Sequence, residues 1–153
     1  MTQHEEFIRL AIKTASDAKD NGNLPFGCIL VDPQGEVIFT AENSINTDCD
    51  CLAHAEINLI RAASKVHSHT YLQGCTIYTS DEPCPMCTSA IYWSGIGKLV
   101  YGLSKEKYYE IVGKDDPNWV FEMPVRALLE KGGRKLEVIG PLLEEEAAVL
   151  HAI

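Results

Sequence analysis

A histidine, a glutamate and two cysteines are the residues of this chain best suited to chemistry. Glu56 lies two positions after His54, and two residues separate Cys84 from Cys87. One imidazole and two thiolates are suitable ligands for Zn²⁺, and a site with three protein ligands leaves its fourth position to water, as catalytic zinc sites do. We therefore predict that His54, Cys84 and Cys87 bind a catalytic zinc ion.

Glu56 is the candidate catalytic residue. Zinc can lower the pKa of a bound water from 15.7 to about 7. Hydrolytic removal of an amino group from a heterocycle takes a proton from that water and delivers protons to a ring nitrogen and to the leaving amine. One carboxylate beside the metal can perform these transfers in turn, first as general base and then as general acid. We expect a closed, water-poor pocket to raise the pKa of Glu56.

The Cys-x-x-Cys motif also has other interpretations, namely a structural zinc site or a redox pair. A structural site needs a second pair of ligands, and the two further pairs in the chain, Cys49/Cys51 and His67/His69, have the wrong spacing for a common zinc finger. A redox pair leaves the His-x-Glu motif unexplained. A non-catalytic, zinc-stabilised interaction domain has no need of Glu56, so catalytic zinc is the favoured interpretation.

Two predicted helix starts bring the metal ligands together. We expect His54 to begin a helix that runs to Val66, and Pro83 to open the next helix. Cys84 and Cys87, three positions apart, then lie on one face of the first turn. The free N–H groups and the positive end of the helix dipole stabilise thiolates over thiols there.

The remaining elements follow from hydrophobic patterning. The first helix begins with a capping box at residues 2–5 and ends at the polar segment 21–23. A proline- and glycine-containing turn at 32–35 joins the first two strands as a hairpin. We expect strands over 28–31, 36–40, 75–79, 98–103 and 135–139, and further helices over 106–112, 124–131 and 142–151. Strands that alternate with helices indicate an α/β fold, a mixed sheet with helices on both faces.

Composition and charge restrict the class of protein. A chain of 153 residues with 46% hydrophobic and 23% charged residues suits one globular core, so we expect residues 1–153 to form a single domain. The formal net charge of −9 is a poor match for a phosphate backbone, so we do not expect a nucleic-acid partner. No apolar stretch is long enough for a membrane span. The N-terminal residues are acidic where a signal peptide is basic, and the six cysteines suit a reducing compartment, so we expect a cytoplasmic protein.

These motifs resemble the cytidine-deaminase-like superfamily, whose zinc deaminases combine His-x-Glu with Pro-Cys-x-x-Cys. Residues 24–31 resemble the first strand of that family with its preceding loop, and residues 79–93 are similar to the corresponding segment of bacterial guanine deaminases. The resemblance covers most of residues 5–103. It implies a three-layer sandwich with a central five-stranded mixed sheet flanked by helices, zinc-dependent aminohydrolase activity and a homodimer.

The resemblance also implies substrate contacts. Asn43 lies eleven residues before His54, where many members of the family have a substrate-binding asparagine. Phe26 and Trp93 match aromatic residues that similar guanine deaminases place around the ring. The backbone N–H of Ala55 is a further candidate. Asn43 can instead cap a turn, and either aromatic side chain can instead belong to the core.

By the same resemblance, a purine-like base is the favoured substrate, with guanine as the leading candidate. Guanine presents N–H donors, so its pocket needs a carboxylate acceptor, and Asp115 or Asp116 is the candidate, although such a run is usually a solvated loop. The acidic end of the chain, with glutamates at 144–146, is unlike the basic ends of tRNA-specific adenosine deaminases. The strand and helix after Gly132, however, resemble nucleoside and tRNA deaminases. Cytidine, adenosine, guanosine, cytosine and tRNA adenosine therefore stay as alternatives.

Overall fold

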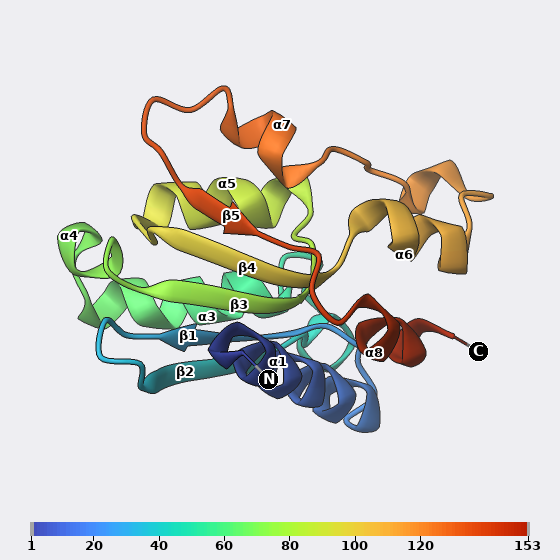
Figure 1. Cartoon of the computed structure of the whole chain (residues 1–153). Helices are drawn as coiled ribbons and strands as arrows, with labels where there is room; N and C mark the ends of the chain where they lie inside the picture. Colours follow the sequence, from blue (N-terminus) through green and yellow to red (C-terminus); the bar gives the residue numbers. More distant parts are fainter. Residues whose placement is uncertain (1, 153) are drawn as a thin grey trace.

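A five-stranded mixed sheet forms the centre of the computed structural model, which describes residues 2–152 (Figure 1). The strand order is β2-β1-β3-β4-β5. Strand β1 pairs antiparallel with β2 and β3, whereas β3, β4 and β5 run parallel. The strands are β1 (Gly27–Val31), β2 (Val37–Glu42), β3 (Thr76–Asp81), β4 (Lys98–Leu103) and β5 (Glu137–Ile139). The predicted mixed sheet is therefore confirmed.

Helices cover both faces of the sheet, which confirms the three-layer arrangement (Figure 1). The long first helix, α1 (Gln3–Asp20), packs on β1 and β3. Two other helices, α3 (Ala55–Val66) and α5 (Pro85–Ser94), lie side by side on the opposite face. The carboxyl end of β3 leads directly into α5, so the sheet sets the position of that helix start.

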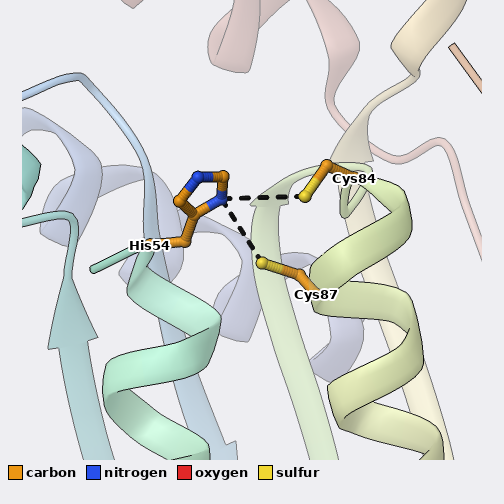
Figure 2. Close-up of side chains that lie close together, drawn as sticks. All are labelled: His54, Cys84 and Cys87. Atoms are coloured by element: carbon orange, nitrogen blue, oxygen red, sulfur yellow. Dashed lines mark hydrogen bonds between the residues drawn. The ribbon is translucent and has the colours of Figure 1, made fainter. Parts of the chain in front are cut away.

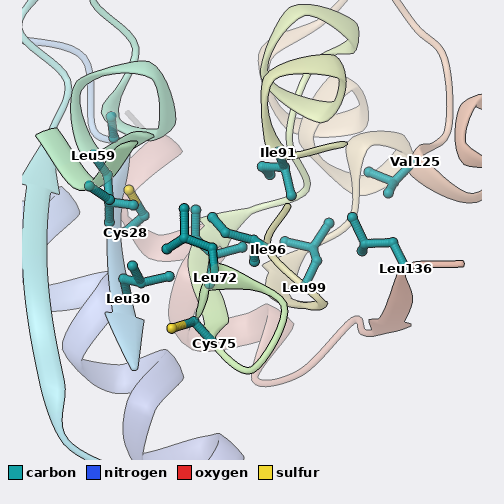
Figure 3. Packing of buried hydrophobic residues seen from close by; sticks show 13 residues of the cluster. Cys28, Leu30, Leu59, Leu72, Cys75, Ile91, Ile96, Leu99, Val125 and Leu136 are labelled. Carbon is teal, nitrogen blue, oxygen red and sulfur yellow. The ribbon is translucent and has the colours of Figure 1, made fainter. Parts of the chain in front are cut away.

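The period of two along each strand separates the core into two parts. In β1, Leu30 joins the cluster beneath α3 and α5, whereas its neighbour Ile29 joins the cluster beneath α1. In β4, Leu99 and Val100 divide in the same way. Side chains that alternate between faces are the expected result of strand geometry. Figure 3 shows the larger cluster, in which strand residues pack against the inner faces of α3 and α5.

Shorter helices complete the chain. They are α2 (Ile45–Asp48), α4 (His69–Leu72), α6 (Lys105–Val112), α7 (Val125–Leu129) and α8 (Glu144–Ala148), with 3₁₀ turns η1 (Pro117–Trp119) and η2 (Val149–His151). The sequence pattern missed α2, α4 and η1, because an element of one turn is too short to show a helical period. Among residues 2–152, no helix is long and apolar enough to cross a membrane.

The start of α5 differs slightly from the prediction. We predicted that Pro83 opens this helix, but the N-cap is Cys84, and Pro85 occupies the first turn. Proline suits that position because its fixed φ fits the helix and its missing N–H has no intrahelical partner there. The shift keeps Cys84 and Cys87 at the helix start. The predicted capping box of α1, between Thr2 and Glu5, is confirmed.

Candidate metal centre and pocket

The structure brings the three predicted metal ligands together at the starts of two adjacent helices (Figure 2). His54 is the N-cap of α3, Cys84 is the N-cap of α5, and Cys87 lies one turn into α5. Nδ1 of His54 lies 3.7 Å from Sγ of Cys84 and 3.4 Å from Sγ of Cys87. The candidate ligand atoms all lie within 4.8 Å of one another, and within residues 2–152 no fourth His, Cys, Asp or Glu joins this group.

The electrostatics of the two cysteines suit a cation. The pKa of the Cys84 thiol is lowered to about 4, mainly by its hydrogen bond with Cys87 and, against the effect of burial, by its hydrogen bond with His54. The hydrogen bond with Cys84, together with burial, raises the pKa of Cys87. The pair therefore shares one proton. A zinc ion in place of that proton balances two thiolates and a neutral imidazole, so these residues fit the ion.

Glu56 is buried beside the ligands, with 8% of its surface exposed. Burial raises the pKa of its carboxyl to about 7, and the negative charge of Cys84 adds to that effect. The predicted rise in pKa is therefore confirmed. A carboxyl group with a pKa near neutrality exchanges protons readily in both directions, which suits a general acid–base catalyst.

A small pocket of about 60 Å³ opens onto this group. Five of the residues singled out from the sequence line it: Phe26, Asn43, His54, Glu56 and Cys84. The sequence reasoning missed the other five, which are Leu24, Ile45, Asp81, Glu82 and Lys105. Cys49 and Cys51 are exposed thiols outside the group of candidate ligands.

Asn43 caps a turn and also lines the pocket, so its position is compatible with both roles considered from the sequence. Its side-chain Oδ1 accepts a hydrogen bond from the backbone N–H of Ile45 (3.1 Å), so it caps the turn before α2. It also lines the pocket and is 99% buried, with 1% of its surface exposed. Its amide NH₂ group donates to no residue in the part of the chain that the structure describes, so that donor stays available in the pocket.

Two other predicted substrate contacts, Trp93 and Asp115, lie outside the pocket. Trp93 is 75% exposed, and Asp115 is exposed in the loop after α6. Trp93 lies six positions after Cys87, which is about 9 Å along the helix and on a different face. Neither side chain lines the pocket of its own chain. Ala55 is the first residue of α3, completely buried between the pocket residues His54 and Glu56, and the contact of its backbone N–H with substrate stays a prediction.

Two carboxylates that line the pocket hold its wall together. The oxygens of Glu82 accept hydrogen bonds from the backbone N–H groups of Lys105 and Val125, both at 2.8 Å, and so connect the starts of α6 and α7. Oδ2 of Asp81 lies 2.7 Å from Nε2 of His151, in the C-terminal 3₁₀ turn. The sequence shows Asp81 and Glu82 only as acidic residues before a helix, because their partners lie more than 20 positions away.

The comparisons with known proteins agree with this geometry. Residues 1–103 match the family model of the cytidine and deoxycytidylate deaminase zinc-binding region. A probable cytosine deaminase of Schizosaccharomyces pombe is 39% identical over 145 residues, 95% of this chain and 88% of the relative. A guanine deaminase of Bacillus subtilis is 42% identical over 92 residues, 60% of this chain and 58% of the relative.

A solved structure from a study of A-to-I editing by tRNA:A34 deaminases is similar in fold, with a TM-score of 0.75 and 30% sequence identity. The similarity covers 95% of this chain and 98% of the other. The region that matches the family model contains His54, Cys84 and Cys87. The family region is described as zinc-binding, and the cluster of His54, Cys84 and Cys87 fits such a site.

Proposed function

The chain belongs to the family of cytidine and deoxycytidylate deaminases, and on this premise we propose that it hydrolytically deaminates a small free base. The family region is described as zinc-binding, a matched relative is a probable cytosine deaminase, and His54, Cys84 and Cys87 are the proposed zinc ligands. The observation that carries the proposal is the burial of Glu56 beside these ligands, in a pocket of only about 60 Å³. A pocket this small suits a single ring better than a nucleoside.

Different residues of the pocket have different roles in the proposed reaction. Zinc, when bound, supplies Lewis-acid activation of a water molecule. The buried carboxylate of Glu56 accepts one proton from the attacking water and passes it to a ring nitrogen. It then accepts the second proton, from the hydroxyl now on the ring carbon, and passes it to the leaving amine, which departs as ammonia. The half-buried ring of Phe26 and the free amide NH₂ of Asn43 orient the base.

Cytosine is our first candidate substrate and guanine the second. The similarity to the cytosine deaminase covers 95% of this chain, whereas that to the guanine deaminase covers 60%. A guanine pocket needs a free carboxylate acceptor, but Asp115 lies outside the pocket, and Asp81 and Glu82 are engaged in other hydrogen bonds. Guanine retains support from the 42% identity of the shared segment.

A panel of ammonia-release assays tests the proposed function. The panel contains cytosine, guanine, adenine, their nucleosides and aminated triazines. We expect a free base to be deaminated with a kcat/KM at least about tenfold above that of its nucleoside, the scale of a steric mismatch in a closed pocket. Release of ammonia from a nucleoside alone, or from no compound in the panel, would contradict the proposal.

A tRNA substrate is the main competing hypothesis, because of the fold similarity to the tRNA:A34 deaminase structure. The formal net charge of −9 supports the small-molecule alternative, since tRNA binding depends on the neutralisation of phosphates by Lys and Arg. A gel-shift assay with a tRNA anticodon stem-loop at low salt distinguishes the two. Tight binding that weakens steeply with salt favours tRNA, and no binding favours the free base.

We also propose that the chain forms a homodimer in the cytoplasm. An open hollow of about 250 Å³ lies between α5 and α7, and its lining includes Tyr92, Trp93, Leu128 and Leu129. Large, exposed aromatic side chains beside such a hollow are typical of protein interfaces.

The proposed location in the cytoplasm has separate support. None of the six cysteines, all within residues 2–152, forms a disulfide, which is typical of a reducing compartment such as the cytoplasm.

A further inference from the structure

Lys105 is a nearly buried lysine on the wall of the pocket. It is the first residue of α6, and only 9% of its surface is exposed. Within residues 2–152, its Nζ forms no hydrogen bond or ion pair. It lies 4.9 Å from the centroid of the Tyr108 ring, a cation–π contact that leaves its N–H donors without an acceptor. An ammonium group removed from water is costly unless it has a partner. The pocket is the space in which that partner can lie.

The nearby carboxylates are already engaged. Both oxygens of Glu82 accept hydrogen bonds from backbone N–H groups, one of which is that of Lys105 itself. One oxygen of Asp81 accepts a hydrogen bond from the neighbouring serine hydroxyl, and the other lies 2.7 Å from His151. Apart from the catalytic Glu56, the described pocket wall therefore offers two donors that no hydrogen bond engages, namely the ammonium of Lys105 and the amide NH₂ of Asn43.

We propose that Lys105 determines substrate specificity by donating a charge-assisted hydrogen bond to a ring carbonyl oxygen of the base. The inference rests on the proposed deamination of a free base and adds the chemical class that the pocket accepts. Two donors in the pocket wall match the two lone pairs of a ring carbonyl oxygen, such as that of a 2-oxo-4-aminopyrimidine, and leave the unprotonated ring nitrogen to Glu56. A base without a carbonyl, such as adenine, leaves the ammonium without a partner and is rejected.

The charge of Lys105 also acts on the catalytic group. Burial raises the pKa of Glu56, and the positive charge of Lys105 opposes that rise. It acts in the same direction on the pKa of His54. The ammonium therefore lies within electrostatic reach of the metal-binding end of the pocket, where the reacting ring must lie.

The test compares substrates that differ only in the carbonyl. Cytosine is paired with 4-aminopyrimidine, and guanine with 2-aminopurine. Lys105→Met removes the donor but keeps an unbranched side chain of similar length. We expect it to lower kcat/KM for the carbonyl-containing member about 10- to 100-fold, and for the other member by less than about threefold. The matched control is Lys107→Met, since Lys107 lies on the same helix but is 51% exposed and pairs with Glu110.

A binding measurement separates this inference from the proposed function. The ligand is 2-pyrimidinone, which carries the carbonyl but no amino group, and its Kd is measured by calorimetry. We expect Lys105→Met to raise the Kd at least about tenfold and Lys105→Gln, which keeps a neutral donor, to raise it less. Unchanged circular dichroism and zinc content show that a variant is folded.

The outcomes distinguish the two claims. Equal losses for both members of a substrate pair overturn the role of Lys105 and leave the proposed function intact. An unchanged Kd for 2-pyrimidinone in Lys105→Met, or no binding of it by the wild-type protein, also overturns that role. Weaker binding in Lys105→Met, together with no ammonia release from any base by the wild-type protein, keeps the role of Lys105 and overturns the proposed function.

Discussion

Glu56 shows how one residue obtains its chemistry from its surroundings. An ordinary glutamate is ionised at neutral pH, but burial and the neighbouring thiolate raise the pKa of this one to about 7. The position of Glu56 two residues after His54 predicted its catalytic role, whereas its raised pKa results from burial in the folded structure. Replacement of Glu56 by other residues therefore separates its chemical role from its structural role.

Glu56→Gln tests the chemical role. We expect the variant to bind zinc as the wild type does and to lose at least a hundredfold in kcat, the low end of acid–base contributions. Ammonia release on the best substrate and elemental analysis of the same sample provide the two measurements. Near-normal activity in a variant that retains zinc would show that another group transfers the protons.

The raised pKa of Glu56 also predicts a pH-dependent stability in the chelator-treated protein. Because folding raises this pKa from 4.5 to about 7, the folded state binds the proton more tightly than the unfolded state. The resulting stabilisation is complete below about pH 4.5 and is lost as the pH rises through 7, a change of about 3 kcal/mol. Urea denaturation between pH 4.5 and 8 measures it. Glu56→Gln should remove this component, and parallel pH curves for the two proteins would contradict the assignment.

At the scale of elements, the C-terminal 3₁₀ turn connects to the pocket. In η2, His151 contacts Asp81 at 2.7 Å, and its ring lies 5.2 Å from the ring of Phe26, between centroids. Asp81 lies at the end of β3, directly before the segment that carries Cys84. The last turn of the described chain thus supports both the aromatic wall of the pocket and the approach to the metal ligands.

His151→Ala tests this connection. It leaves one oxygen of the buried Asp81 carboxylate without its partner, so we expect the free energy of unfolding to fall by about 1–3 kcal/mol and kcat/KM to fall with it. Val149→Ala is the matched control, because Val149 lies in the same turn but is 67% exposed. Urea denaturation and steady-state kinetics measure both effects. Equal behaviour of the two variants would mean that η2 does not support the pocket.

At the scale of the whole molecule, the proposed homodimer makes a prediction about Trp93. The side chain is 75% exposed on α5, beside the hollow next to α7. We expect Trp93→Ala to shift the protein from dimer to monomer, because a central aromatic residue often carries 2 kcal/mol or more of interface energy. Analytical ultracentrifugation measures the change. Trp119→Ala is the control, since Trp119 is 79% exposed but lies outside that hollow. A monomeric wild type would contradict the proposal.

Local patterns predicted most of the fold and the metal centre. Short β-rich runs and the turn between the first two identified the strands, and the spacing of His54, Cys84 and Cys87 identified the ligands that the structure brings together. The residues of the pocket wall were harder to predict from the sequence, because Lys105 and His151 reach the wall through contacts between residues far apart in the chain. A local pattern carries no information on such contacts. The expected role of Trp93 came from resemblance alone, whereas its helical distance from Cys87 already pointed away from the pocket.

The central claim is a zinc ion with three protein ligands and one position open to water. X-ray absorption at the zinc edge of the purified, active protein tests it most directly. We predict one zinc per chain, with two sulfur neighbours at about 2.3 Å and two nitrogen or oxygen neighbours at about 2.0–2.2 Å. Active protein without zinc, or a zinc ion with three or four sulfur neighbours, would contradict it.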